Sequence, residues 1–355
     1  MRELDVLVIG AGQAGLAMGY YLKKSELSFE ILGMEKRIGD TWRNRYDSLI
    51  LFTPRWYSAL PGVSLAGDPQ GLASKDEMAD YLEKYAEYFE LPVKLETQVL
   101  SVEKDNEFYI VKTNKGPYKV LNLVIATGPF SKPHIPQMAD GLSPEIFQIH
   151  TSSYRNVGQL HPGNVLVVGA GNSGAQIAVE LAGDREVHLS AGHRLHFFPL
   201  RLAGKNIFWW FRMLGILDRE KGSRLGDFLS RQKDPIFGTE LKRAIGMNGV
   251  RIRPRTISID SNTVTFMDST QLRVDNIIWA TGFVPDYGWL HIPGVLDGHG
   301  RPVHHRGISP VKGLYYLGLP WLTSRKSALI GGVGDDAEMV YNKLVSEYNS
   351  TYFIS

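Results

Sequence analysis

Hydrophobic and polar positions along the chain repeat one pattern twice. An apolar run at residues 5–9 and another at 164–168 each lead into a glycine-rich turn and then into an apolar helical stretch. Short apolar runs bounded by turn residues are typical of strands buried in a parallel sheet. Two later runs, 123–125 and 277–279, both end in Ala-Thr-Gly. The pattern predicts an α/β fold made of two related units, each with its own closing strand.

Both turns have the spacing GxGxxG. Their glycines are Gly10, Gly12 and Gly15 in the first turn, and Gly169, Gly171 and Gly174 in the second. Glycines at these positions permit a tight turn, close approach of the backbone to a pyrophosphate and close helix–sheet packing, while the helix N-terminus offers unpaired N–H groups. The two turns therefore predict two Rossmann-like domains that bind two dinucleotides, with electron transfer between them.

Residues next to the turns and at the ends of the closing strands complete the two predicted nucleotide sites. They are Gln13 and Ala14 after the first turn, Asn172 and Ser173 in the second, and the strand ends Ala126-Thr127-Gly128 and Ala280-Thr281-Gly282.

The pattern between and after these units predicts further elements. Ser74 and Glu77 form a capping box before an apolar helical stripe that is expected to be core, namely Met78, Tyr81, Leu82, Tyr85, Tyr88 and Phe89. The proline-rich segment 129–136 indicates a crossing between domains, and 197–245, rich in aromatic and basic residues, fits neither unit. A strand is expected at 313–318, and a helix is expected to open at Asp335, after Gly334.

Composition restricts the function. The 355 residues carry a net charge of +2 without a dense basic cluster, so nothing indicates nucleic-acid binding. No apolar run reaches membrane-spanning length and no signal-peptide pattern is seen, so we expect a cytoplasmic protein. Because the chain has no cysteine, disulfide reduction and thiolate metal ligation are excluded, and no metal site is expected. The electron acceptor must be free in solution, such as oxygen, a quinone or a partner protein.

The paired turns, Gly39-Asp40-Thr41-Trp42, the two Ala-Thr-Gly strand ends and the segment 331–336 together resemble the flavin-dependent monooxygenase superfamily. The closest resemblance is to a compact bacterial branch related to class B flavin monooxygenases and plant indole-pyruvate oxygenases, and it covers nearly the whole chain except 197–245. It implies FAD at the first turn, with Gly39, Thr41 and Trp42 among its contacts, and NADPH at the second. It also implies that an NADPH-binding domain, 136–290, is inserted into an FAD-binding domain formed by 1–135 and 291–355.

The acid with which this family binds the FAD ribose is missing from its usual place. At the end of the second strand, which we predict at 28–32, the position is Gly33. Glu35 is the candidate substitute, because the acid is expected roughly 20 residues past the glycines. Glu30 lies in mid-strand and is interpreted as a solvated or capped charge.

Two other family features are altered. Of the motif Phe-x-Gly-x-x-x-His-x-x-x-Tyr/Phe, only His150 and Tyr154 keep their spacing, while Pro144 and Ile146 replace the phenylalanine and the glycine. His150 is therefore interpreted as a linker or structural residue. The family often places a polar side chain beside the reactive flavin nitrogen; here the matching residue is Phe52, which is either an altered catalytic position or part of the core.

The second unit lacks an acid at the end of its second strand, 187–190. NAD-specific sites use such an acid to accept from the ribose 2′-OH, whereas a nearby arginine accommodates the 2′-phosphate of NADPH. Ser190, His193 and Arg194 are the candidates. We therefore expect NADPH to be preferred over NADH, the alternative being that Arg194 is an ordinary surface arginine.

By the resemblance, NADPH reduces FAD, and a peroxyflavin oxygenates a small sulfur or nitrogen nucleophile or a ketone. The helix expected near Gly334 would direct its positive end at the flavin. Two alternatives remain: an NADPH-dependent flavin reductase or oxidase that makes hydrogen peroxide or serves a partner protein, and a non-catalytic flavoprotein that senses NADPH. The aromatic segment 197–211 roofs a substrate cavity, rests on a membrane surface or packs between domains. A homodimer also remains open.

Overall fold

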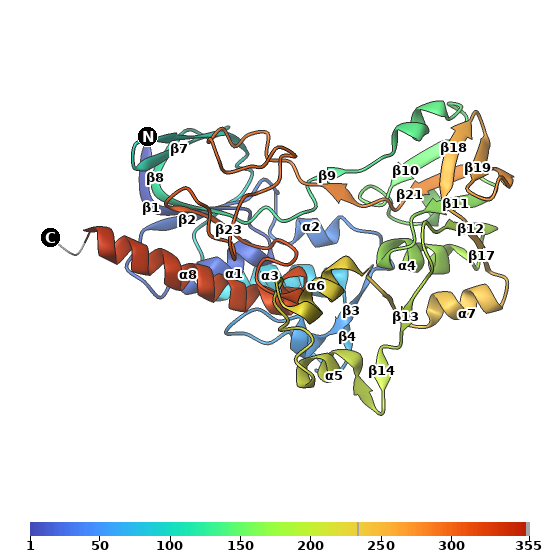
Figure 1. The fold of residues 1–355 in the computed structure, drawn as a ribbon, viewed down its shortest axis with the longest axis horizontal. Helices are drawn as coiled ribbons and strands as arrows, with labels where there is room; N and C mark the ends of the chain where they lie inside the picture. Colours follow the sequence, from blue (N-terminus) through green and yellow to red (C-terminus); the bar gives the residue numbers. More distant parts are fainter. Residues whose placement is uncertain (233, 353–355) are drawn as a thin grey trace.

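A computed structural model of the chain describes residues 1–232 and 234–352. Its mixed α/β fold contains two main sheets, the large sheet and the small sheet, which lie at opposite ends of an elongated molecule (Figure 1). Each sheet contains one of the two strand–turn–helix units, so the repeated sequence pattern has a repeated structural counterpart.

The large sheet has seven strands in the order β5-β2-β1-β8-β7-β6, with β23 also paired to β8. The strands are β1 (Arg2–Ile9), β2 (Phe29–Leu32), β5 (Val93–Lys94), β6 (Val99–Asp105), β7 (Phe108–Thr113), β8 (Tyr118–Ile125) and β23 (Leu314–Tyr316). β1 is parallel to β2 and β8, and β23 is parallel to β8. The C-terminal part of the chain thus returns to the sheet that contains the N-terminal strand.

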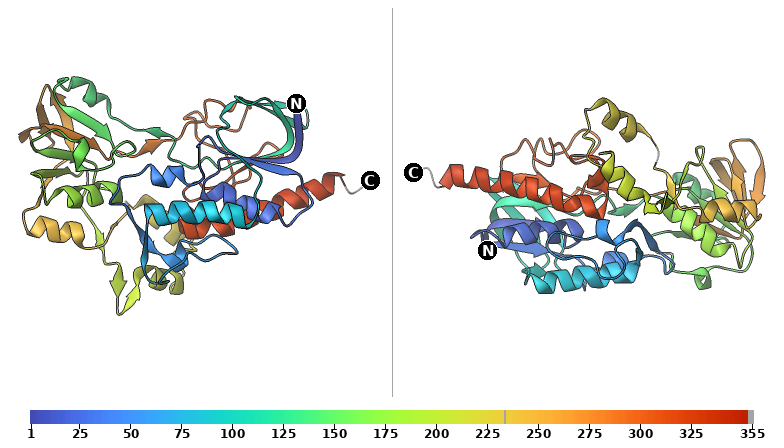
Figure 2. Two further views of the ribbon diagram at one scale, coloured as in Figure 1. Left: turned by 180° about the vertical axis from the view of Figure 1, so that it is seen from behind. Right: turned by 90° about the horizontal axis from the view of Figure 1, so that it is seen from below.

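Three helices form a layer on the large sheet. α1 (Gln13–Leu22) lies between α3 (Lys75–Tyr88) and α8 (Ile330–Tyr352), as the right view of Figure 2 shows. Their buried side chains join those of β1 and β8 in the main core. The predicted capping box of Ser74 and Glu77 is confirmed at the start of α3. The predicted stripe is wrong at its end, because Tyr88 is 72% exposed.

Helix α8 begins five residues before the predicted start, at Ile330 rather than Asp335. The glycines of the segment therefore lie inside the helix. A Cβ on Gly331 would overlap the Tyr57 carbonyl oxygen, and one on Gly334 would lie 2.7 Å from the Pro61 ring. Close packing of the helix on this neighbouring segment, rather than a turn before the helix, explains these glycines.

The small sheet is fully parallel, in the order β10-β21-β11-β12-β17. Its strands are β10 (Phe147–His150), β11 (Val165–Val168), β12 (Val187–Ser190), β17 (Val250–Arg253) and β21 (Asn276–Trp279). Because side chains alternate along a strand, Val165 and Val167 pack with α4 (Asn172–Leu181) and α7 (Glu240–Gly246), whereas Leu166 and Val168 pack on the other face. That face is covered by the antiparallel strands β18 (Thr256–Asp260), β19 (Thr263–Phe266) and β20 (Gln271–Arg273).

Two short strands connect the two halves of the molecule. β9 (Lys132–Pro133) pairs antiparallel with β22 (Phe283–Val284), so the outgoing and returning segments run side by side (Figure 1). The proline-rich segment 129–136 is therefore a crossing, as predicted.

The aromatic part of segment 197–245 packs against β3 (Ile50–Pro54) and the 3-10 helix Arg55–Tyr57 that follows it. It contains the pairs β13 (Phe197–Phe198) with β16 (Ile236–Phe237) and β14 (Arg201–Leu202) with β15 (Lys205–Asn206), and the helices α5 (Ile207–Met213) and α6 (Arg224–Arg231). Phe208 and Leu217 are buried against Phe52 and Tyr57. Packing is thus one role of this aromatic segment. The end of the segment, α7, instead packs on α4 beneath the small sheet.

Candidate functional site

The first glycine turn joins β1 to α1 through contacts that leave no space for side chains. Gly10 has a φ of +115°, which L side chains rarely adopt, and a Cβ on it would lie 2.5 Å from the Ala126 carbonyl oxygen. A Cβ on Gly15 would overlap the carbonyl oxygen of Gly10. These two glycines let the turn close against the end of β8 and let α1 approach β1.

The second turn, between β11 and α4, has the same geometry. Gly169 has a φ of +108°, and a Cβ on it would overlap the Ala280 carbonyl oxygen. A Cβ on Gly174 would overlap the carbonyl oxygen of Gly169. The structure therefore brings each Ala-Thr-Gly strand end to its own glycine turn.

The middle glycines are different, because both face open space. Gly12 and Gly171 have ordinary φ values of −80° and −79°, and each is the N-cap of its helix. A Cβ on either would have no atom within 4 Å. Neither helix has a side-chain cap or an acid in its first turn. The first N–H groups of α1 and α4 thus face sites that fit the pyrophosphate of a dinucleotide.

Two of the predicted contacts beside the second turn are engaged within the protein. The Asn172 amide donates to the Pro235 carbonyl at 3.2 Å and accepts from the Phe237 N–H at 3.0 Å, so it anchors β16. Ser173 lies beside the Tyr46 phenol. In the first turn, Ala14 is buried and packs against Gly318, while Gln13 opens α1.

Glu35 lies close to the first turn. Its Oε2 would be 3.0 Å from a Cβ on Gly33, and that Cβ would be 2.8 Å from the Cβ of Ala11. Gly33 thus leaves the space through which the Glu35 carboxylate approaches the turn. Glu30 was interpreted as a solvated or capped charge. It is not solvated, since it is 2% exposed, but ion pairs with Arg2 and Lys94 cap its charge.

The position of Gly39 requires a glycine for structural reasons. It precedes α2 (Asp40–Arg43) with a φ of +88°, and a Cβ on it would lie 2.6 Å from the Ala79 carbonyl oxygen. It therefore allows α2 to approach α3. Thr41 is exposed, and Trp42 packs against the main core.

The strand-end threonines and glycines lie at the crossing. Gly128 and Gly282 have φ values of +69° and +81° with open space beside them. Thr281 donates to the His134 carbonyl, and Thr127 follows Ala126 at the end of β8.

Of the three residues expected near a 2′-phosphate, two are exposed and one is not. Ser190 is 2% exposed, donates to the Pro254 carbonyl at 2.9 Å and accepts from Thr256, so its hydroxyl is already engaged. His193 and Arg194 are exposed just beyond β12. Arg255 also lies here, although it was not predicted: its Nε would lie 3.0 Å from a Cβ on Gly192. The sequence shows an arginine just past β17. Its place beside Gly192 depends on the pairing of β17 with β12, which the sequence does not reveal.

Phe52 is part of an aromatic cluster. Its ring stacks on Phe237 with centroids 4.7 Å apart and an interplanar angle of 11°, and on Phe208 at 6.1 Å. Since Asn172 binds the backbone of Phe237, the stack connects β3 with the second turn.

His150 is a structural residue at the crossing, which agrees with its interpretation. Its Nδ1 accepts from the Ser152 N–H at 3.1 Å, so its Nε2 donates to the Gly282 carbonyl at 2.9 Å. Burial is the main cause that lowers its pKa. Tyr154 is fully buried and donates to Glu180 at 2.9 Å.

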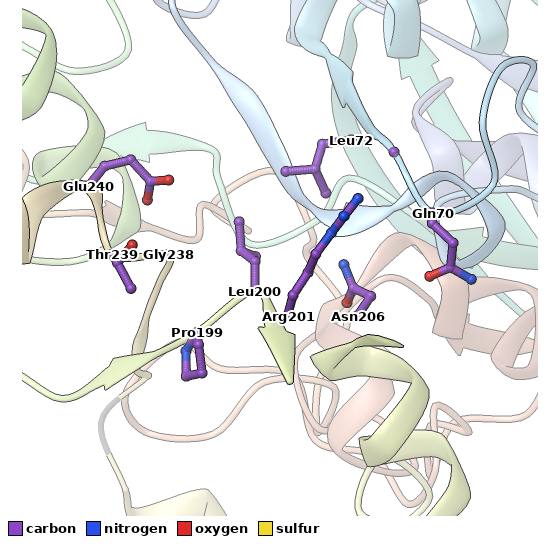
Figure 3. Close-up of a pocket in the computed structure, with 10 residues that line it drawn as sticks. Gln70, Leu72, Pro199, Leu200, Arg201, Asn206, Gly238, Thr239 and Glu240 are labelled. Carbon is purple, nitrogen blue, oxygen red and sulfur yellow. The ribbon is translucent and has the colours of Figure 1, made fainter. Parts of the chain in front are cut away.

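A groove of about 430 Å³ lies between β4 (Leu72–Ser74) and segment 197–245. Gln70 and Leu72 face Leu200, Arg201 and Asn206 across it, and Figure 3 shows Arg201 extending toward Leu72. A second cavity, of about 270 Å³, adjoins His150 and Trp279. Neither is lined by a residue of the glycine turns.

Within residues 1–232 and 234–352, no group of three or more histidine, aspartate or glutamate side chains is placed to hold a metal ion. In the same part of the chain, no helix has both the length and the apolar character needed to cross a membrane.

Comparisons with known proteins agree with this geometry. Residues 7–194 match the family described as pyridine nucleotide-disulphide oxidoreductase. An "uncharacterized oxidoreductase CzcO-like" of Geobacillus kaustophilus is 59% identical over 97% of this chain and 99% of that protein. A "probable indole-3-pyruvate monooxygenase YUCCA3" of Arabidopsis thaliana is 29% identical over 88% of this chain and 81% of that protein.

Among solved structures, a flavin-containing monooxygenase from Stenotrophomonas maltophilia superposes with a TM-score of 0.82 and 26% identity, over 98% of this chain and 99% of that chain. The chain therefore belongs to the pyridine nucleotide-disulphide oxidoreductase family and, as a flavoprotein oxidoreductase, to the flavin-dependent monooxygenase superfamily.

Proposed function

We propose that this chain is an FAD-dependent, NADPH-using monooxygenase. FAD binds at the turn of residues 10–15 and NADPH at the turn of residues 169–174. The large sheet with the C-terminal segment forms the FAD-binding domain, and the small sheet forms the inserted NADPH-binding domain. The observation that carries the proposal is the duplicated turn, in which two glycines are closed against backbone while Gly12 or Gly171 faces open space.

The residues of the chain have distinct roles in this proposal. Gly12 and Gly171 admit the pyrophosphates to the helix N-termini. Glu35 accepts from the FAD ribose, and Arg194 with Arg255 holds the 2′-phosphate. The Phe52–Phe237 stack shields the space between β3 and the second turn from water. FAD, when bound, supplies electron transfer from NADPH to O₂ and thereby the oxygen atom for a small sulfur or nitrogen nucleophile or a ketone.

Oxygen consumption with NADPH, measured together with peroxide release and a panel of sulfides and ketones, tests the function. A monooxygenase consumes one O₂ per NADPH, with an oxygenated product and little peroxide when its substrate is present. NADPH oxidation with equal peroxide release for every compound would contradict oxygenation.

That outcome would support a second candidate, an NADPH oxidase or reductase that produces peroxide or serves a partner protein. Oxygenation requires a substrate site adjoining the flavin, whereas peroxide release does not.

A further inference from the structure

The guanidinium of Arg45 packs against two phenylalanine rings that come from opposite sides of the crossing. Its central carbon is 5.8 Å from the ring centroid of Phe130 and 5.1 Å from that of Phe283. Phe130 follows β8, Phe283 follows β21, and the two rings meet edge to face at 5.4 Å. Arg45 is therefore positioned just beyond the carboxyl ends of one strand from each sheet, where α/β proteins bind ligands.

Arg45 is half-buried without an anionic partner among the described residues. Within the described part of the chain, no carboxylate and no side-chain hydrogen bond acts on its guanidinium. Burial lowers its pKa, Tyr46 opposes this shift, and the charge of Arg155 adds to it. Arg155 donates to the carbonyl oxygens of Ser152 and Tyr154. A guanidinium removed from water requires acceptors for its five N–H donors, and its planar fork suits phosphate.

The segment that carries Arg45 is attached to the helix of the second turn. Tyr46 is 3% exposed and donates to Gln176 of α4 at 2.9 Å, and Gln176 donates to the Ile50 carbonyl at 3.0 Å. The phenol also lies beside Ser173, in the first turn of α4. These contacts hold the segment at the end of α4 where Gly171 leaves its open space.

We propose that Arg45 binds the pyrophosphate of the nicotinamide nucleotide held at the second turn. A residue that follows α2, in the half of the molecule with the large sheet, thus completes the nucleotide site of the small sheet. The inference rests on the proposed function, which assigns a nicotinamide nucleotide to that turn.

Calorimetric titration of the FAD-loaded protein with NADP⁺ and with NAD⁺ tests the proposal. Arg45→Met keeps an unbranched side chain against the two rings and removes the charge. Both dissociation constants should rise roughly 10- to 150-fold, because both nucleotides carry the pyrophosphate. Arg45→Lys keeps the charge but not the planar fork of N–H donors, so the loss of affinity should be smaller than in Arg45→Met. Arg212→Met is the matched control, since Arg212 lies 5.6 Å from the Trp56 ring centroid, is exposed and should leave both affinities unchanged.

Three results would overturn the proposal while leaving the proposed function in place. They are unchanged affinities in a folded Arg45→Met protein, a loss confined to NADP⁺, and a loss of FAD with unchanged NADP⁺ affinity. The second would assign Arg45 to the 2′-phosphate and the third to FAD. If the wild-type protein bound neither nucleotide, the proposed function itself would fail. Should Arg45→Met unfold, Arg45→Lys decides: weaker binding of both nucleotides supports the proposal, because the bidentate fork is lost, and affinities equal to those of the wild type count against it.

Discussion

Gly12 and Gly171 occupy equivalent places in the two turns, and both accept a methyl group without a clash inside the protein. Gly12→Ala should therefore fold normally and lose FAD, because the methyl group occupies the place of the pyrophosphate. Overpacking of about 1–3 kcal/mol corresponds to roughly 5- to 150-fold weaker binding. Flavin absorbance per protein measures this loss.

Gly171→Ala is the matched variant and should keep FAD while losing NADP⁺ binding. Full flavin occupancy in folded Gly12→Ala protein would remove the basis for placing FAD at the first turn.

Glu35 is the proposed acid for the FAD ribose. Glu35→Ala should weaken FAD binding by about 1.5–3 kcal/mol, the range for hydrogen bonds to charged groups. Gly33→Glu should not compensate, because its Cβ would lie 2.8 Å from that of Ala11. Fluorescence of FAD released on dilution gives the affinities. Equal affinity of Glu35→Ala and wild type would exclude Glu35 as a ligand.

Arg194 is exposed beyond β12, so we expect a moderate, coenzyme-specific role. Arg194→Ala should raise KM for NADPH about tenfold and leave KM for NADH unchanged, because only NADPH carries the 2′-phosphate. Steady-state NADPH and NADH oxidation measures both values. Arg255→Ala should act in the same direction. If KM rose equally for both coenzymes, Arg194 would act through folding or general charge.

At the scale of single residues, the sequence predicted local backbone requirements better than side-chain partners. The glycine spacing predicts each turn correctly. The turn's glycines contact the end of a neighbouring strand, and that strand is itself recognisable as an apolar run in the sequence. Ser190 and Asn172 were predicted as nucleotide contacts, yet their hydroxyl and amide are engaged by Thr256 and Phe237. Such partners lie more than 60 residues away, and no local pattern reveals them.

Among the elements, β16 contacts β3 through the ring of Phe237, which stacks on Phe52. Phe237→Leu should destabilise the protein by about 1 kcal/mol, because it removes the stack on Phe52 while keeping an apolar side chain. It should also raise the fraction of NADPH electrons recovered as peroxide. Thermal melting and peroxide assays measure the two effects. Phe228→Leu on α6, where the ring is 59% exposed, is the control and should change neither.

The types of element were predictable, but some of their limits were not. The start of α8 was misplaced because glycine normally indicates a turn, whereas here Gly331 and Gly334 allow the helix to touch Tyr57 and Pro61. Elements of segment 197–245 were not predicted, because strands of two residues are too short to show a period. Aromatic contacts with β3 position Phe208 and Phe237, whereas α7 packs on α4.

For the whole molecule, acid should weaken the crossing. The folded protein holds the pKa of His150 below the ordinary value of 6.5, mainly through burial, with Arg45 and His134 adding to the effect. The unfolded chain therefore binds more protons below pH 6.5, so the stabilisation is complete above that pH and is lost as the pH falls below it. Burial also lowers the pKa values of His188 and His304.

We expect Tm to fall between pH 7 and pH 5 by a smaller amount in His150→Gln than in wild type. Scanning fluorimetry across this range measures the difference. Parallel Tm–pH curves for the two proteins would show that His150 does not contribute.

The pairing of β23 with β8 and the docking of α8 beside α1 have a consequence for the order of folding during synthesis. All five strands of the small sheet have left the ribosome once Trp279 has emerged, so that sheet can close while translation continues. The large sheet, begun at Arg2, still lacks β23 and the whole of α8 at that moment. Domains generally fold in the order in which they are made, but here the half of the protein that is begun first is finished last.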